Sequence, residues 1–246
     1  MALHRNVTVR TLADYVKLFS ARGTFASAQP RWYRGEGRFR NKRALLPSIA
    51  RAPHSTSDEW AIYQRFRQNA AAFLPHMNLS EWDWMLYMRH FSARTRLLDW
   101  TESPLVALYF AVVNEKRRRV DGVVWSIDPV RLNELAGFER RVYCAGIDTE
   151  LDVYTPSQVK AATEDAKFKP AALITARSFP RLVAQQGVFT VIHRNAMALD
   201  SIDDDRLLAH IRIPAKAKAR IRAGLRQLGV NRLSLYPELQ SVTDKV

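Results

Sequence analysis

Apolar residues recur every three or four positions through much of the first half of the chain, a spacing that places them on one face of a helix. Helix-start signals precede these stretches, such as the capping-box pair Ser80 and Asp83 and the cap and first-turn proline at Ser103 and Pro104. The helix after Ser103 is apolar nearly all round, which predicts a place in the centre of the core. Helices are expected over residues 12–21, 57–74, 80–88 and 105–115.

In the second half, short apolar or alternating runs replace the helical spacing. Strands are expected over residues 31–34, 122–127, 171–175, 187–192 and 207–213, and helices over 129–135 and 215–228. Helices followed mostly by strands, without regular alternation of the two, are typical of the α+β class. With no internal repeat and no Gly- or Ser-rich linker, the pattern predicts a single domain in which N-terminal helices pack on a mostly antiparallel sheet.

Composition narrows the class of protein further. The chain has 246 residues, 47% of them hydrophobic, which is ample for a core of its own. A single cysteine, Cys144, excludes an internal disulfide and fits a structural thiol better than a nucleophile. The longest apolar run, Leu105 to Val113, is shorter than the ~20 residues of a membrane span. The N-terminus lacks a secretory pattern, so we expect a cytoplasmic protein with no membrane partner.

The charge points to a polyanionic partner. Lys and Arg total 38 against 24 Asp and Glu, a formal net charge of +14. Most of the basic residues are arginines, whose planar fork of donors matches phosphate groups. Two stretches concentrate this charge and give five predicted nucleic-acid contacts: Arg38, Arg40, Lys218, Arg222 and Arg226. A solvated basic face is the alternative interpretation of both stretches.

Several common sites are absent from the sequence. There is no phosphate loop of the GxxxxGK[ST] type, no HExxH metal motif and no GxSxG nucleophile elbow. The six histidines are scattered without the spacing of metal ligands, so no metal is expected.

Five short motifs remain, and together they resemble the FRG domain family. They are Tyr33-Arg34-Gly35, Leu46-Pro47-Ser48, the run from Thr95 to Thr101, the run from Ser103 to Phe110, and Gln185 to Phe189. The run that reads TRLLDWT is the most specific of them. The resemblance covers most of the chain and implies one FRG-like domain over residues 1–246 with its core at about 31–240.

A second resemblance is to the Arg-Ser-Glu class of ADP-ribosyltransferases, which also begins with an aromatic-Arg-Gly on its first strand. It implies an ADP-ribosyltransferase-like split sheet and NAD as co-substrate, with Arg34 on a phosphate of NAD. The glutamates that this class carries before a later strand are replaced here by Gln185 and Gln186. Asp99 is our candidate for the missing carboxylate, which would stabilise the oxocarbenium-like transition state, and Gln186 would bind a ribose hydroxyl.

These arguments predict one site. Its expected catalytic residues are Asp99, His90 and Gln186, and its expected cofactor-binding residues are Tyr33, Arg34, Gly35, Thr95 and Arg96. Arg96 and Asp99 are also close enough in sequence to pair within a turn, the structural alternative for both.

The favoured function is that of an NAD-dependent ADP-ribosyltransferase-like toxin or defence effector, with RNA or DNA as acceptor and a neutralising antitoxin protein as a second partner. One alternative is a nucleic-acid-binding or ribonuclease-like domain without NAD chemistry, in which His90 does acid–base work. Another is a catalytically silent interaction module. Turnover of labelled NAD separates the first hypothesis from the other two.

Overall fold

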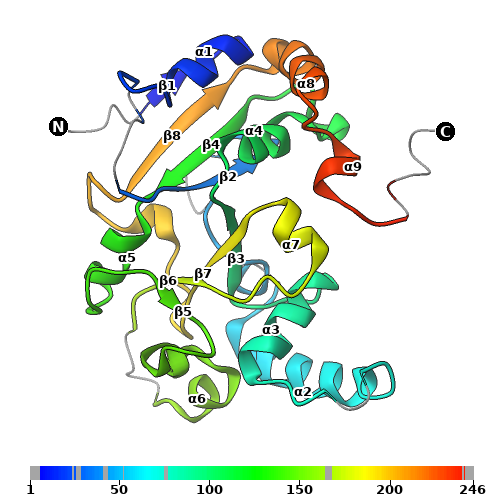
Figure 1. The fold of residues 1–246 in the computed structure, drawn as a ribbon. Helices are drawn as coiled ribbons and strands as arrows, with labels where there is room; N and C mark the ends of the chain where they lie inside the picture. Colours follow the sequence, from blue (N-terminus) through cyan, green and yellow to red (C-terminus); the bar gives the residue numbers. More distant parts are fainter. Residues whose placement is uncertain are drawn as a thin grey trace.

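The computed structural model describes residues 6–23, 25, 29–40, 44–51, 53–74, 77–163, 168–239 and 241 (Figure 1). Within them, eight strands form one mixed sheet in the order β1-β8-β4-β2-β3-β7-β6-β5. The strands are β1 (Asn6–Thr8), β2 (Trp32–Glu36), β3 (Leu97–Thr101), β4 (Gly122–Ile127), β5 (Tyr143–Cys144), β6 (Ala171–Ile174), β7 (Gly187–Val191) and β8 (Leu208–Ile213). The two outermost pairs are parallel and all the inner pairs are antiparallel. The predicted α+β class and mostly antiparallel sheet are confirmed.

The sheet is weakest at its middle. β2 and β3 share a single residue pair, Tyr33 with Thr101, whereas β2 runs along β4 and β3 along β7 over their whole lengths. The strands form one hydrogen-bonded sheet whose halves diverge beyond that pair. The further likeness to an ADP-ribosyltransferase fold stays a prediction.

Helices cover both faces of this sheet. They are α1 (Leu12–Lys17), α2 (Glu59–Ala70), α3 (Glu81–His90), α4 (Pro104–Val112), α5 (Pro129–Leu135), α6 (Pro156–Ala161), α7 (Pro180–Ala184), α8 (Lys218–Gln227) and α9 (Arg232–Leu235). On one face, α1, α4 and α8 pack on the half that ends in β2, and α3 packs on the half that begins with β3. α5 covers the opposite face, where Trp32, Trp100 and Trp125 meet. The middle of the first face is therefore bordered by α3 and α4.

The local signals located most elements correctly. The Ser80–Asp83 capping box and the Ser103 cap both form as predicted, and β4 and α5 have the predicted bounds. Helix α2 differs, because Ser55 and not Ser57 caps the turn that leads into it. The strand β3 was not predicted, although its run was singled out for its chemistry. No helix in the described part of the chain is long and apolar enough to cross a membrane.

Candidate functional site

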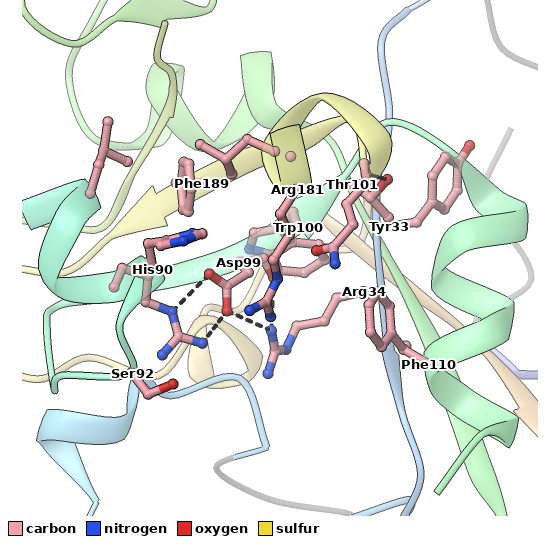
Figure 2. A pocket seen from close by; sticks show the side chains of 16 residues that line it. Tyr33, Arg34, His90, Ser92, Asp99, Trp100, Thr101, Phe110, Arg181 and Phe189 are labelled. Carbon is pink, nitrogen blue, oxygen red and sulfur yellow. Dashed lines mark hydrogen bonds and ion pairs between the residues drawn. The ribbon is translucent and has the colours of Figure 1, made fainter. Parts of the chain in front are cut away.

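A pocket of about 240 Å³ lies where β2 and β3 diverge (Figure 2). Strands β2, β3 and β7 form its floor, α3 and α7 one side, and Phe110 of α4 the other. Aromatic side chains and arginines line it together, which suits a ligand that carries both a ring and a negative charge. The lining residues are Tyr33, Arg34, Gly35, Leu86, Arg89, His90, Ser92, Asp99, Trp100, Thr101, Phe110, Arg181, Leu182, Gln185, Gly187 and Phe189.

Arg34 bridges the gap between the two central strands. Beyond Tyr33 and Thr101, a closed antiparallel ladder would set Arg34 opposite Trp100 and then Gly35 opposite Asp99, but these pairs do not form. Arg34 Nη1 instead donates to the backbone carbonyl of Asp99 at 2.8 Å, and its Nε donates to Glu36 Oε1 at 3.1 Å. The guanidinium therefore replaces missing ladder contacts and lies at the pocket wall, with N–H donors to spare.

Asp99 is the acidic centre of the pocket. Arg89, from the last turn of α3, donates Nε to Asp99 Oδ1 at 2.8 Å and Nη2 to Oδ2. Arg34 Nη1 lies 3.9 Å from Oδ2. Partial burial acts to raise the pKa of Asp99, but the hydrogen bonds and charge of Arg89, with the charges of Arg34 and Arg181, outweigh it and lower the pKa. Asp99 is therefore ionised at neutral pH.

His90, the last residue of α3, and Arg181, of α7, both line the pocket. The His90 ring stacks on Phe179 at a centroid distance of 4.2 Å and an interplanar angle of 6°. Burial and the charge of Arg181 lower the pKa of His90, so the imidazole is neutral at pH 7. The guanidinium of Arg181 lies 4.6 Å from the centroid of the Tyr236 ring, a cation–π contact that orients it. A neutral His90 can accept a proton from a ligand in the pocket.

The pocket has an excess of positive charge. Arg34, Arg89 and Arg181 line it, and Asp99 is the lining carboxylate. Glu36 pairs with Arg34 just beside it. An anionic ligand would meet three guanidinium groups that protein partners already orient, an arrangement that favours phosphate binding.

Five of the residues predicted for the site lie in the pocket: Tyr33, Arg34, Gly35, His90 and Asp99. Three do not. Thr95 and Arg96 are fully buried outside it, and the side chain of Gln186 is exposed. Gln186 has a positive φ of 47°, and its neighbour Gln185 lines the pocket while donating to the Leu235 carbonyl.

Arg96 holds the core together instead of facing a ligand. It forms a buried ion pair with Glu59, and it donates to the carbonyls of Ile192 at 2.9 Å and Tyr154 at 2.5 Å. The predicted pairing of Arg96 with Asp99 is wrong, because Arg96, just before β3, pairs with Glu59, and Asp99 pairs with Arg89. The partner of Arg96 lies 37 positions away in sequence, where no local pattern could identify it.

Gly35 is required by helix packing. A Cβ at this position would overlap the carbonyl oxygen of Ala107, since α4 crosses β2 directly above it. The sequence predicts Gly35 as a cofactor-binding residue. Its close backbone approach is to helix α4, and it also lines the pocket.

The five predicted nucleic-acid contacts differ in exposure. Arg38, Arg40 and Arg226 are exposed, and Arg222 is half-buried in an ion pair with Glu115. Lys218 is buried, and its Nζ donates to the carbonyls of Gly37 at 2.7 Å and Arg117 at 3.0 Å. In this arrangement the Lys218 ammonium cannot reach an external phosphate.

Sequence reasoning missed two charged residues of the pocket, Arg89 and Arg181. Both lie outside the five motifs that suggested the family. Arg89 lies one residue before His90 in the last turn of α3, and Arg181 is the second residue of α7. Only the packing of α3 and α7 on β3 and β7 brings them to Asp99. Among the described residues, no group of three or more His, Cys, Asp or Glu could hold a metal ion.

Comparison with known families gives a match to part of the chain, which includes some of the pocket residues. The family model of the FRG domain matches residues 29–119. Over these residues, the chain is similar to the FRG domain. The matched segment runs from just before β2 to the turn after α4, so the FRG match supplies the pocket residues from β2, α3, β3 and α4. Residues from α7 and β7 complete it from outside the match. No curated protein and no solved structure shows a detectable match to the chain.

Proposed function

We propose that this FRG-domain protein is an NAD-dependent ADP-ribosyltransferase-like effector whose NAD site is the pocket between β2 and β3. The observation that carries the proposal is the group of Arg34, Arg89 and Arg181 around an ionised Asp99 in a pocket with aromatic walls. The arginines match the pyrophosphate of a dinucleotide, and the aromatic rings match its bases. At about 240 Å³ the pocket would admit only part of NAD, and the remainder would extend across its mouth.

The chemistry would be a substitution at the ribose. The bond from the nicotinamide nitrogen to ribose C1′ breaks, and nicotinamide leaves with the electron pair. The sugar then carries positive charge, which the Asp99 carboxylate would stabilise. An acceptor hydroxyl or amine forms the new bond to C1′ and gives its proton to neutral His90. Asp99 would do this while Arg89 and Arg34 fix its position.

The test is release of nicotinamide from labelled NAD, with RNA, DNA and protein offered as acceptors. Wild type should release nicotinamide, and Arg34→Ala should release it at least ~100-fold more slowly, because both its phosphate contact and its hold on Asp99 are lost. Arg140→Ala is the matched control, since Arg140 is an exposed arginine outside the pocket lining. Equal rates in wild type and Arg34→Ala would overturn the proposal, as would no release with any acceptor.

The same reactions distinguish the ribonuclease-like alternative. Hydrolysis of RNA without NAD, lost in His90→Ala, would favour it over ADP-ribosyl transfer. Hydrolysis of RNA by general acid–base catalysis commonly uses an acid and a base together. In the described lining, His90 is the one imidazole, and the Asp99 carboxylate is held by Arg89. This arrangement supports the NAD proposal better than a nuclease.

A further inference from the structure

Three basic segments that are far apart in sequence meet at one end of β2. Lys218, at the start of α8, is buried, and its ammonium binds the carbonyls of Gly37 and Arg117. Arg38 follows Gly37 directly, and Arg117 lies within the run of four basic residues 116–119, between α4 and β4. The run was not singled out from the sequence. One buried lysine thus joins the end of β2, the 116–119 loop and the first turn of α8.

Further contacts fix the same junction. A Cβ on Gly37 would lie 3.4 Å from the Cβ of Arg117, so the chain after β2 passes close to the 116–119 loop. Arg222 of α8 pairs with Glu115, next to the basic run, and α4 and α8 lie side by side (Figure 1). Phe39 N donates to the Asp121 carbonyl at 2.8 Å, which holds the chain after Arg38 against the start of β4. These contacts hold the three segments together at the junction.

The cations around this junction face solvent. We call the side chains of Arg38, Lys116, Arg117, Arg118, Arg119 and Lys216 the basic surface; all six are exposed and none forms an ion pair with a described residue. The neighbouring carboxylates, Glu115 and Asp121, are already paired with Arg222 and Arg212. The basic surface therefore has positive charge that no described carboxylate neutralises.

We infer that the basic surface binds the phosphate backbone of a nucleic acid. Four of its six cations are arginines, whose planar guanidinium groups match phosphate geometry. The phosphates of a nucleic acid are also more regularly spaced than the carboxylates of an acidic protein, so a nucleic acid is the favoured partner. Protein segments that bind a membrane surface carry large apolar side chains beside their cations. In the three basic segments of the junction, Val120 is the exposed large apolar residue among those described. This composition favours a nucleic acid over a membrane. Lys218, which the sequence predicts as a nucleic-acid contact, instead holds together the segments that carry the exposed cations.

The position of the basic surface connects it to the pocket. Arg38 is four residues after Arg34, in the bend that follows β2, so their Cα atoms are at most roughly 13 Å apart at about 3.3 Å per residue. A strand held by the basic surface could therefore place a nucleotide at the mouth of the pocket. This step rests on the proposed function, whereas binding of nucleic acid by the basic surface does not.

The test compares two double variants of equal charge. Arg118→Gln with Arg119→Gln removes two cations of the basic surface, and Arg140→Gln with Arg206→Gln removes two exposed arginines beside α5. Binding of a fluorescent 20-nucleotide RNA is measured by anisotropy from 50 to 200 mM salt. The basic-surface variant should bind about tenfold more weakly than wild type at 100 mM salt, with a salt slope lower by about 1 to 2. The control should bind within about twofold of wild type.

Two outcomes would overturn the inference. Equal weakening in both double variants would mean that the RNA responds only to net charge. Wild-type binding to vesicles of phosphatidylserine and phosphatidylcholine, without RNA binding, would assign the surface to membranes. Nicotinamide release without acceptor is measured in parallel and should be unchanged in the basic-surface variant. Absent release with normal RNA binding would refute the proposed function and leave this inference standing.

Discussion

Asp99 has a structural role in addition to the chemical role that we propose for it. Its backbone carbonyl accepts from Arg34 and its carboxylate accepts from Arg89, so β2, β3 and α3 meet at this residue. The carboxylate still faces the pocket, with 40% of the side chain exposed. A substitution of Asp99 can therefore change both stability and turnover, so both need to be measured.

Asp99→Asn tests the chemical role. The amide keeps the size of the side chain and its backbone contact, but it removes the charge that would stabilise a cationic transition state. We expect NAD turnover to fall about 100-fold, while the Kd for NAD changes by less than about threefold. Steady-state rates and equilibrium binding are compared at a temperature where both proteins are folded. Turnover equal to that of wild type would remove Asp99 from the reaction.

Gly35 provides a residue-scale test of the helix crossing. Gly35→Ala should lower the free energy of unfolding by about 3 kcal/mol, because the new methyl group must push α4 away from β2. Gly37→Ala is the control, since its nearest neighbours are side-chain carbons at 3.3 Å or more. Denaturant unfolding measures both variants. Equal stability of the two would show that α4 moves aside without cost.

At the scale of elements, the buried Arg96–Glu59 pair joins α2 to the sheet. Arg96 also binds carbonyls of η4 (Thr149–Tyr154) and of Ile192, which follows β7. Glu59→Gln should lower the free energy of unfolding by about 3 to 5 kcal/mol, because it leaves the guanidinium charge buried and uncompensated. The change is read from urea unfolding. A loss below about 1 kcal/mol would mean that water or another group neutralises Arg96.

Elements whose ends are fixed by local hydrogen bonds could be predicted from the sequence. Ser80–Asp83 and Ser103–Pro104 start their helices through hydrogen bonds within four residues, so the signal and the structure coincide. β3 escaped prediction because its polar Asp99 lies at the gap in the sheet, where a regular strand would have an apolar residue. The aromatic-Arg-Gly motif located the pocket. The partners of Arg96, Arg89 and Lys218 depend on contacts between distant segments, which no local pattern contains.

At the scale of the whole molecule, stability should fall in mild acid through His193. This histidine is 1% exposed, and neither ring nitrogen has a hydrogen-bond partner among the described residues. Burial, with the charges of Arg96 and Arg194, lowers the pKa of His193 to about 4. Between pH 6.5 and 4 the unfolded chain therefore binds a proton that the native chain does not.

His193→Phe should remove this dependence. Between pH 6.5 and pH 4, the wild type should lose up to about 3 kcal/mol of unfolding free energy through His193, in addition to the losses from other groups. The variant should show only the losses from the other groups. Urea unfolding at several pH values measures the difference. Parallel pH profiles of the two proteins would show that His193 is protonated in the native state as readily as in the unfolded state.

At the scale of the whole molecule, Arg34 links the two diverging halves of the sheet, and the pocket lined by arginines lies at this gap. For the proposed function, this pocket must bind NAD. Isothermal titration calorimetry of NAD into wild type, Arg34→Ala and Arg140→Ala tests it most directly. We predict saturable binding at one site in wild type and Arg140→Ala, and an affinity at least ~10-fold lower in folded Arg34→Ala. Equal affinity in all three proteins, or no binding to wild type, would contradict the account.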